Sequence, residues 1–145
     1  MKSAMTFKQL VVLLILIFFG IQFIPVDRTN PPTETLAVGP QPVMDLLRRS
    51  CFDCHSNETV WPWYGIVAPF SWVVARDVNR ARDKMNFSTW NRLSLADQER
   101  LMDEIWKKVK AGDMPPPMYV FGKQEGRVTT DHHRMLREWC GIPPN

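Results

Sequence analysis

Two cysteines and a histidine stand close together in the run Cys51-Phe52-Asp53-Cys54-His55. This C-x-x-C-H spacing is the attachment signal of c-type haem, in which the thiols bond the porphyrin and the histidine ligates the iron. Two thiols three positions apart at a helix end can reach the two vinyl groups on one edge of the porphyrin. The run therefore predicts one covalent haem c per chain, bound by Cys51, Cys54 and His55, with His55 as the proximal ligand of its iron.

The same thiols also allow other interpretations. A disulfide can form between Cys51 and Cys54 in an oxidising compartment, although so short a loop is more typical of a redox-active pair than of a structural crosslink. A thioredoxin-like dithiol belongs beside a β-α-β pattern, and none is visible. Zinc needs two further ligands, for which only His132, His133 and Cys140 are available, without a second paired-cysteine motif. We favour haem because the N-terminal segment predicts export, and c-type attachment is completed outside the cytoplasm.

The second axial ligand of the iron decides what such a haem does. We predict Met114, because it follows a predicted helix end and precedes Pro115-Pro116-Pro117, which would present the thioether from a rigid loop. Cytochromes c are similar in placing a Met-Pro pair downstream of the attachment motif. The alternatives are Met118, His132, His133, Met85, Met102, Met135 and an open or weakly ligated iron. Of these, Met85, Met102 and Met135 lie on apolar helical faces, where methionine usually fills a core.

A histidine–methionine pair fills both axial positions and raises the haem potential, which suits outer-sphere electron transfer. We therefore expect a one-electron carrier rather than an enzyme, exchanging electrons with redox partner proteins that the sequence does not name. The second hypothesis is a haem peroxidase-like enzyme. We favour it less than the carrier because the sequence offers no convincing acid–base residue for the distal side of the haem. A haem-based sensor or assembly module with an open or weakly held sixth site is the third alternative.

The size of the chain narrows these classes further. Its 145 residues suit one domain, which excludes an enzyme with separate cofactor and substrate lobes and a channel with several spans. The formal net charge of +3 is small and evenly spread, so we expect no nucleic-acid partner.

The N-terminal segment, residues 1–26, contains an almost unbroken apolar run from Leu10 to Ile24 behind Lys2 and Lys8. Counted from Met5 to Val26, with a few weakly polar residues included, the apolar stretch approaches the ~20 residues of a spanning helix, and the segment has no A-x-A-like cleavage site. We predict an uncleaved transmembrane anchor in the inner membrane, and a cleaved signal sequence is the alternative. Lysines on the N-terminal side of the apolar run keep the N-terminus in the cytoplasm, so the rest of the chain would lie on the periplasmic side of the membrane. After cleavage it would be soluble in the periplasm.

Residues 27–42 are rich in proline and predict an extended linker that holds the domain off the membrane like a stalk. The alternative is an irregular arm packed on the domain. The haem-binding domain then covers residues 43–145. Because no run alternates with period two, we predict a mostly α, small cytochrome c-like fold.

Four helices are expected in this domain. The first covers 43–50 and leads into Cys51, and the second repeats apolar residues over 74–85, with Ser71 as its N-cap. The third begins at Ser94, with Asp97 completing a capping box, and ends at Gly112. The last begins at Thr129 or Thr130.

Several short motifs in this order resemble the small bacterial haem-binding domain family. They are Cys51-Phe-Asp-Cys-His55-Ser56-Asn57, Trp61-Pro62-Trp63-Tyr64, Ala68-Pro69-Phe70-Ser71-Trp72, Asn86-Phe87-Ser88 with Trp90, and Gly112-Asp113-Met114-Pro115. The resemblance covers nearly all of 43–139 and implies a periplasmic c-type haem protein. It implies little about physiological role, because the family is defined by a site more than by a reaction.

Three further groups of residues have two interpretations each. The aromatic side chains after the motif either cover the haem or pack an ordinary core, and they are Trp61, Trp63, Tyr64, Phe70 and Trp72. Arg76, Arg80 and Lys84 recur at helical spacing and either reach the haem propionates or form a solvated face. Cys140 is expected to be a buried small side chain, with an intermolecular disulfide as the alternative.

Overall fold

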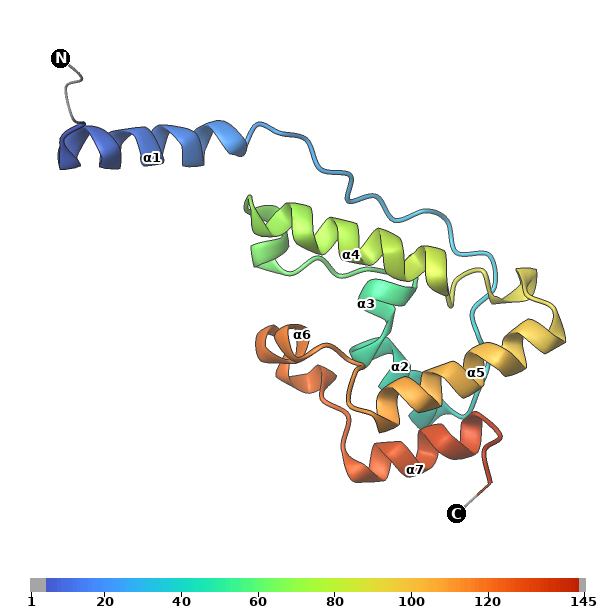
Figure 1. Cartoon of the computed structure of the whole chain (residues 1–145). Helices are drawn as coiled ribbons and strands as arrows, with labels where there is room; N and C mark the ends of the chain where they lie inside the picture. Colours follow the sequence, from blue (N-terminus) through green and yellow to red (C-terminus); the bar gives the residue numbers. More distant parts are fainter. Residues whose placement is uncertain (1–4, 144–145) are drawn as a thin grey trace. The chain divides into compact units, whose positions relative to one another are not determined.

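The computed structural model describes residues 5–143, and within that range the regular elements are helices (Figure 1). The helices are α1 (Phe7–Ile21), α2 (Gln41–Ser50), α3 (Phe52–His55), α4 (Phe70–Lys84), α5 (Leu95–Lys110), α6 (Pro117–Gly122) and α7 (Thr130–Trp139). Single 3-10 turns occur at η1 (Trp63–Ile66), η2 (Trp90–Arg92) and η3 (Gln124–Gly126). The prediction of a mostly α protein is confirmed.

The chain divides into two compact units. Unit 1 consists of Met1–Thr29 and Trp61–Arg76, and unit 2 consists of Asn30–Val60 and Asp77–Asn145. This division differs from the boundary expected at residue 43, because the segment before α2 belongs to unit 2. The C-x-x-C-H motif and Met114 both belong to unit 2.

In unit 1, α1 begins at a capping box. The Gln9 backbone N–H donates to the Thr6 hydroxyl at 3.4 Å, and the Thr6 N–H donates to the Gln9 side chain at 2.9 Å. After the helix ends, the Gln22 side-chain amide binds the backbone of Ala68, accepting from its N–H at 2.9 Å and donating to its carbonyl at 3.2 Å. The end of α1 is thus joined to the loop before α4.

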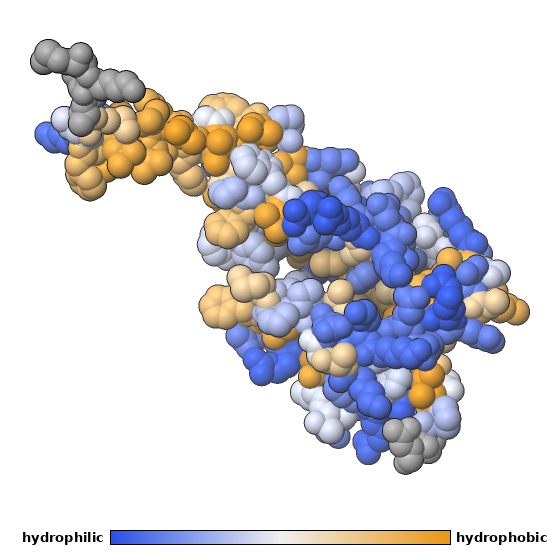
Figure 2. All heavy atoms as spheres, in the orientation of Figure 1, coloured by the Kyte–Doolittle hydropathy of each residue, from blue (hydrophilic) through white to orange (hydrophobic). Residues whose placement is uncertain are grey.

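The predicted spanning helix over residues 1–26 is not found in the described part of the chain. No helix within residues 5–143 is both long enough and apolar enough to cross a membrane. Although the α1 surface is hydrophobic (Figure 2), the helix has 15 residues against the ~20 that a span needs. It is short because Thr6 caps its start and the helical hydrogen bonding stops before Pro25, which has no N–H to donate. Lys2, the first of the two predicted basic flanks, lies outside the described residues.

The segment from Asn30 to Pro40 is extended, as its prolines predict, but the expectation of a free stalk is wrong. The Glu34 and Ala37 N–H groups donate to the carbonyls of Ser88 and Phe87 at 2.9 and 3.1 Å, and Ala37 is buried. The Trp139 indole donates to the Val38 carbonyl at 3.1 Å. The residues between the prolines keep their backbone donors, and these bind unit 2, so the segment is the packed arm that formed the alternative.

The core of unit 2 is built around α2. Its buried face, Val43, Leu46 and Leu47, packs in one cluster with Leu136 of α7. In the same cluster Phe52, Phe87 and Trp90 stack in series with centroid distances of 5.3 and 5.6 Å. Cys140 is 8% exposed in this cluster and is a free thiol, as expected for a small core side chain.

The helix ends follow the sequence signals closely. The Ser94 hydroxyl accepts from the Asp97 N–H at 3.1 Å at the start of α5, and Gly112 has a φ of 77° just after its end. The α7 helix begins at Thr130, one of its two predicted starts, and Thr129 is its N-cap. The expected N-cap at Ser71 is wrong, because α4 begins at Phe70, directly after Pro69.

Candidate haem site

The C-x-x-C-H motif occupies the short helix that follows α2. The Cys51 N–H still donates to the Leu47 carbonyl of α2 at 2.8 Å, and the Cys51 carbonyl accepts from the His55 N–H at 2.9 Å. Cys51 is therefore the residue at which α2 ends and α3 begins, and Cys54 lies one helical turn further along the chain. Both cysteines are free thiols, and both line the same cavity.

The environment of the two thiols keeps them protonated. Burial, aided by the neighbouring Cys54, raises the pKa of Cys51 to about 12. Burial and the adjacent Asp53 charge raise the pKa of Cys54 to about 11. Thiolates are the reactive form in disulfide exchange and the form that zinc binds, so this environment favours neither alternative. Among residues 5–143 no group of three or more cysteine, histidine or acidic side chains is arranged to hold a metal ion.

The imidazole of His55 is oriented by the end of α4. Its Nδ1 lies 3.1 Å from the Ala81 carbonyl oxygen and 3.2 Å from the Met85 carbonyl oxygen. Because carbonyl oxygens only accept, Nδ1 carries the hydrogen and Nε2 keeps its lone pair. Burial also lowers the pKa of His55, which favours the neutral ring. This is the arrangement in which a protein holds a metal-ligating histidine: one ring nitrogen fixed by hydrogen bonds and the other available as a ligand.

A cavity of about 530 Å³ lies against the motif in unit 2. It is lined by the end of α2, by α3, by the second half of α4, by α5 and by the segment that follows α5. Its volume lies within the range of cofactor sites, ~300–1,000 Å³. Its aromatic lining comes from Phe87 and Tyr119, and Leu101, Ile105 and Val109 contribute an aliphatic wall from α5.

The lining fits a haem. The porphyrin is a large apolar plate, and the cavity offers it apolar walls, two thiols and a histidine with a free Nε2. Ser50 also lines the cavity, and its hydroxyl is buried and has no hydrogen-bond partner among the described residues. A buried hydroxyl without a partner is costly in a protein interior, so this atom indicates that the cavity accommodates a bound group.

Met114 lines the same cavity as Cys51, Cys54 and His55, and the structure therefore brings the four predicted site residues together. The Met114 backbone N–H donates to the Lys108 carbonyl of α5 at 3.3 Å. The residue is 39% exposed. Of the other methionines, Met85 also lines the cavity, but its carbonyl contacts the edge of the His55 ring that faces away from Nε2.

The remaining candidates for the second axial position lie elsewhere in unit 2. Met118 is 77% exposed on α6. Met102 and Met135 pack against the core cluster. His132 accepts a hydrogen bond from Arg49 at 2.9 Å, and His133 lies edge-on to Trp106. None of these five side chains is among the residues that line the cavity.

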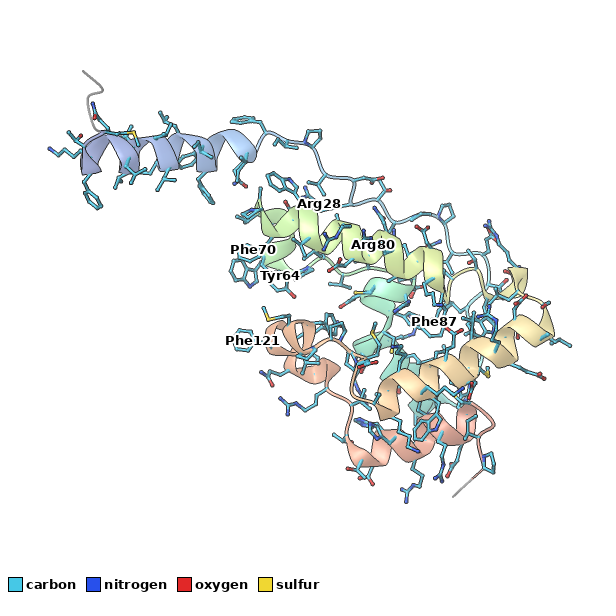
Figure 3. The ribbon with its side chains drawn as sticks, in the orientation of Figure 1. Arg28, Tyr64, Phe70, Arg80, Phe87 and Phe121 are labelled. Carbon is cyan, nitrogen blue, oxygen red and sulfur yellow. The ribbon has the colours of Figure 1, made fainter. Side chains whose placement is uncertain are left out.

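The aromatic residues predicted to cover the haem and the basic residues predicted to reach its propionates do not all belong to the same unit. The five aromatic residues belong to unit 1 and are not among the residues that line the cavity, so their cover of the haem stays a prediction; they are Trp61, Trp63, Tyr64, Phe70 and Trp72. Trp63 and Phe70 are largely exposed. Arg80 and Lys84 line the cavity, whereas Arg76 belongs to unit 1. Figure 3 labels Arg80 on α4 and Phe87 in the turn that follows.

Asp53, inside the motif, makes contacts that the sequence did not reveal. It is 7% exposed, and its Oδ2 accepts from Lys123 at 2.7 Å. The single hydrogen of the Tyr119 hydroxyl is shared between Asp53 Oδ2 at 2.9 Å and the Arg49 carbonyl at 3.0 Å. Burial, followed by the Asp53 charge, raises the pKa of Tyr119. An acidic residue between the two cysteines is visible in the sequence. Its partners are not, because Lys123 is 70 residues away along the chain.

The comparisons with known proteins agree with this geometry. Residues 16–141 match the sequence model of a family described as the haem-binding domain. The match covers most of the chain, including the motif, Met114 and the helices that line the cavity. The protein therefore belongs to the haem-binding domain family. Searches of curated proteins and of solved structures find no significant match.

Proposed function

We propose that the protein holds one haem c covalently through Cys51 and Cys54 and acts as a one-electron carrier with His55 and Met114 as axial ligands. The observation that carries this proposal is that all four side chains line one cavity of cofactor size. The orientation of the His55 ring supports it, because the nitrogen that would face the iron is free.

The two thiols are suited to thioether formation. Each S–H would add across the C=C bond of a vinyl group, with the sulfur bonding one carbon and the hydrogen bonding the other. No oxidant or reductant is consumed, but both cysteines must be reduced and free. Cys51 and Cys54 meet this condition, since both are free thiols.

A bound haem supplies one-electron iron redox chemistry whose potential is raised by histidine–methionine ligation. His55 contributes a neutral imidazole that the α4 carbonyls hold in one orientation. Met114 contributes a thioether from a loop tied to α5. If His55 and Met114 both bind the iron, peroxide would find no open coordination site, which favours a carrier over a peroxidase-like enzyme or a ligand sensor.

We place this function on the periplasmic side of the inner membrane. The apolar N-terminal segment behind Lys8 supports export, and c-type attachment requires it. The partners are then redox proteins of the same compartment. Fractionation of cells that express the full chain tests this: haem staining should follow the periplasmic or membrane fraction, and staining in the cytoplasm alone would contradict it.

The ligand assignment is tested by Met114→Ala in the holoprotein, with the exposed Met118→Ala as the matched control. We expect Met114→Ala to lose the red-region absorption band of methionine-ligated ferric haem and to bind added imidazole. Met118→Ala should keep both properties of the wild type. An unchanged spectrum in Met114→Ala would reject Met114 as a ligand and leave the haem attachment untouched.

A further inference from the structure

The segment that carries Met114 is held at both ends by hydrogen bonds. At its start, the N–H groups of Asp113 and Met114 donate to the Lys108 carbonyl at the end of α5, at 3.0 and 3.3 Å. At its end, Tyr119 and Lys123 bind Asp53 between the two cysteines. Met114 therefore lies between an anchor on α5 and an anchor on the attachment motif.

Apolar packing contributes little to holding this segment. The α6 helix has six residues and buries none of them fully, and Met118 and Phe121 are 77% and 80% exposed. Figure 3 shows Phe121 on α6. The Tyr119 ring packs closely against Gly126, because a Cβ placed on this glycine would lie 2.8 Å from the Tyr119 Cε1 atom. Glycine at position 126 thus leaves room for the ring that reaches Asp53.

Asp53 makes no contact that would give it a direct part in binding the porphyrin, since it is not among the residues that line the cavity. Its other carboxylate oxygen accepts from the Val60 N–H at 3.2 Å, so the carboxylate is fixed from its own side as well. A buried carboxylate with a cation and a hydroxyl on one oxygen is a rigid attachment point.

We propose that Asp53 is a positioning residue for the second axial ligand: through Tyr119 and Lys123 it fixes the segment that presents Met114 to the iron. Cys51 and Cys54, which would attach the haem, flank Asp53, so its carboxylate links the attachment motif to the segment that carries Met114. The proposal rests on the proposed function, because it takes Met114 as a ligand.

The test compares Asp53→Asn and Tyr119→Phe with the wild-type holoprotein. Glu58→Gln is the matched control, because Glu58 lies near the motif and pairs with Arg48 at 2.7 Å, but on the surface. We expect both test variants to keep the covalent haem, to weaken the methionine absorption band, and to bind imidazole at least tenfold more tightly. Partners of metal ligands typically change affinity by ~10–100-fold when they are removed. The control should match the wild type.

A double-mutant cycle separates positioning from general destabilisation. If the carboxylate acts through the hydroxyl, the effects of Asp53→Asn and Tyr119→Phe on imidazole affinity are not additive. Wild-type imidazole affinity in Asp53→Asn and in Tyr119→Phe would overturn the proposal. If Asp53→Asn does not mature, Tyr119→Phe decides alone by the same criterion.

A second measurement does not depend on haem ligation. In the wild-type full chain the Lys123 ammonium is held by Asp53, so trypsin should cleave after Lys123 slowly, and Asp53→Asn should accelerate that cleavage relative to Glu58→Gln. If the wild type shows no methionine ligation, the proposed function fails on that result. Unchanged cleavage in Asp53→Asn would instead reject the anchor itself.

Discussion

The pair formed by Lys123 and Asp53 allows a quantitative prediction about stability. Its atoms are 2.7 Å apart, and the side chains are 25% and 9% exposed. Removing one partner of a buried pair costs ~3–5 kcal/mol, because the other charge stays buried without compensation. Asp53 keeps the Tyr119 and Val60 hydrogen bonds and Lys123 is partly solvated, so we expect Lys123→Met to cost about 3 kcal/mol.

The matched control is the same substitution in an exposed pair. Lys107 and Asp103 are 2.5 Å apart on α5, with side chains 70% and 42% exposed. Exposed helical pairs contribute ~0.3–0.5 kcal/mol, so Lys107→Met should be nearly neutral. The comparison therefore changes burial while it keeps the residue types and the close approach of the charges.

The assay is reversible urea unfolding of the holoprotein, followed by circular dichroism. With a slope of ~2 kcal/mol per M, a loss of about 3 kcal/mol lowers the midpoint by ~1.5 M for Lys123→Met. Lys107→Met should shift it by less than ~0.3 M. Equal midpoints for the two variants would refute the reasoning, since burial would then make no difference to the pair.

Two further predictions concern the lining and the remaining thiol. Arg80→Ala should lower the haem reduction potential by ~20–60 mV, because loss of a cation at the cavity favours the ferric state and 59 mV is a tenfold change in a one-electron equilibrium. Arg76→Ala is its control, because Arg76 is on the same helix but is not among the residues that line the cavity, and equal shifts in protein-film voltammetry would contradict a specific role. Burial raises the pKa of Cys140 to about 12, so the folded protein keeps this thiol protonated while the unfolded chain ionises it near its usual 9.0. Stability from this residue is therefore full below pH 9 and declines above it, a decline that Cys140→Ala should abolish in urea unfolding measured against pH.

The parts of the fold that are encoded locally could be predicted from the sequence. The start of α5 at Ser94 and its end before Gly112 depend on neighbouring residues, and the structure has both. The attachment motif is also local, because its spacing is set by one turn of helix. Met114 was predicted from the loop that carries it, and the structure places it on the same cavity as His55.

The remaining features depend on pairings between distant residues. Prolines predict that residues 30–40 are extended, but only the fold shows that Ala37 donates to the Phe87 carbonyl and is buried. Local sequence also does not show which aromatic residues line the cavity. Trp61 and Phe87 look equally suited to a haem pocket, but Phe87 lines the cavity and Trp61 belongs to unit 1. Asp53 is the clearest case: its acidic side chain is visible in the motif, whereas Lys123 is 70 residues away.

The central claim is that Cys51 and Cys54 attach one haem covalently. The most direct measurement is the mass of the full chain after expression with a c-type maturation system, followed by denaturation and acidified-solvent extraction. The account predicts a chain heavier by one haem, with a pyridine haemochrome spectrum of the two-thioether type, and no retained haem in Cys51→Ala with Cys54→Ala. A wild-type chain at its bare polypeptide mass, with all haem in the extract, would contradict it.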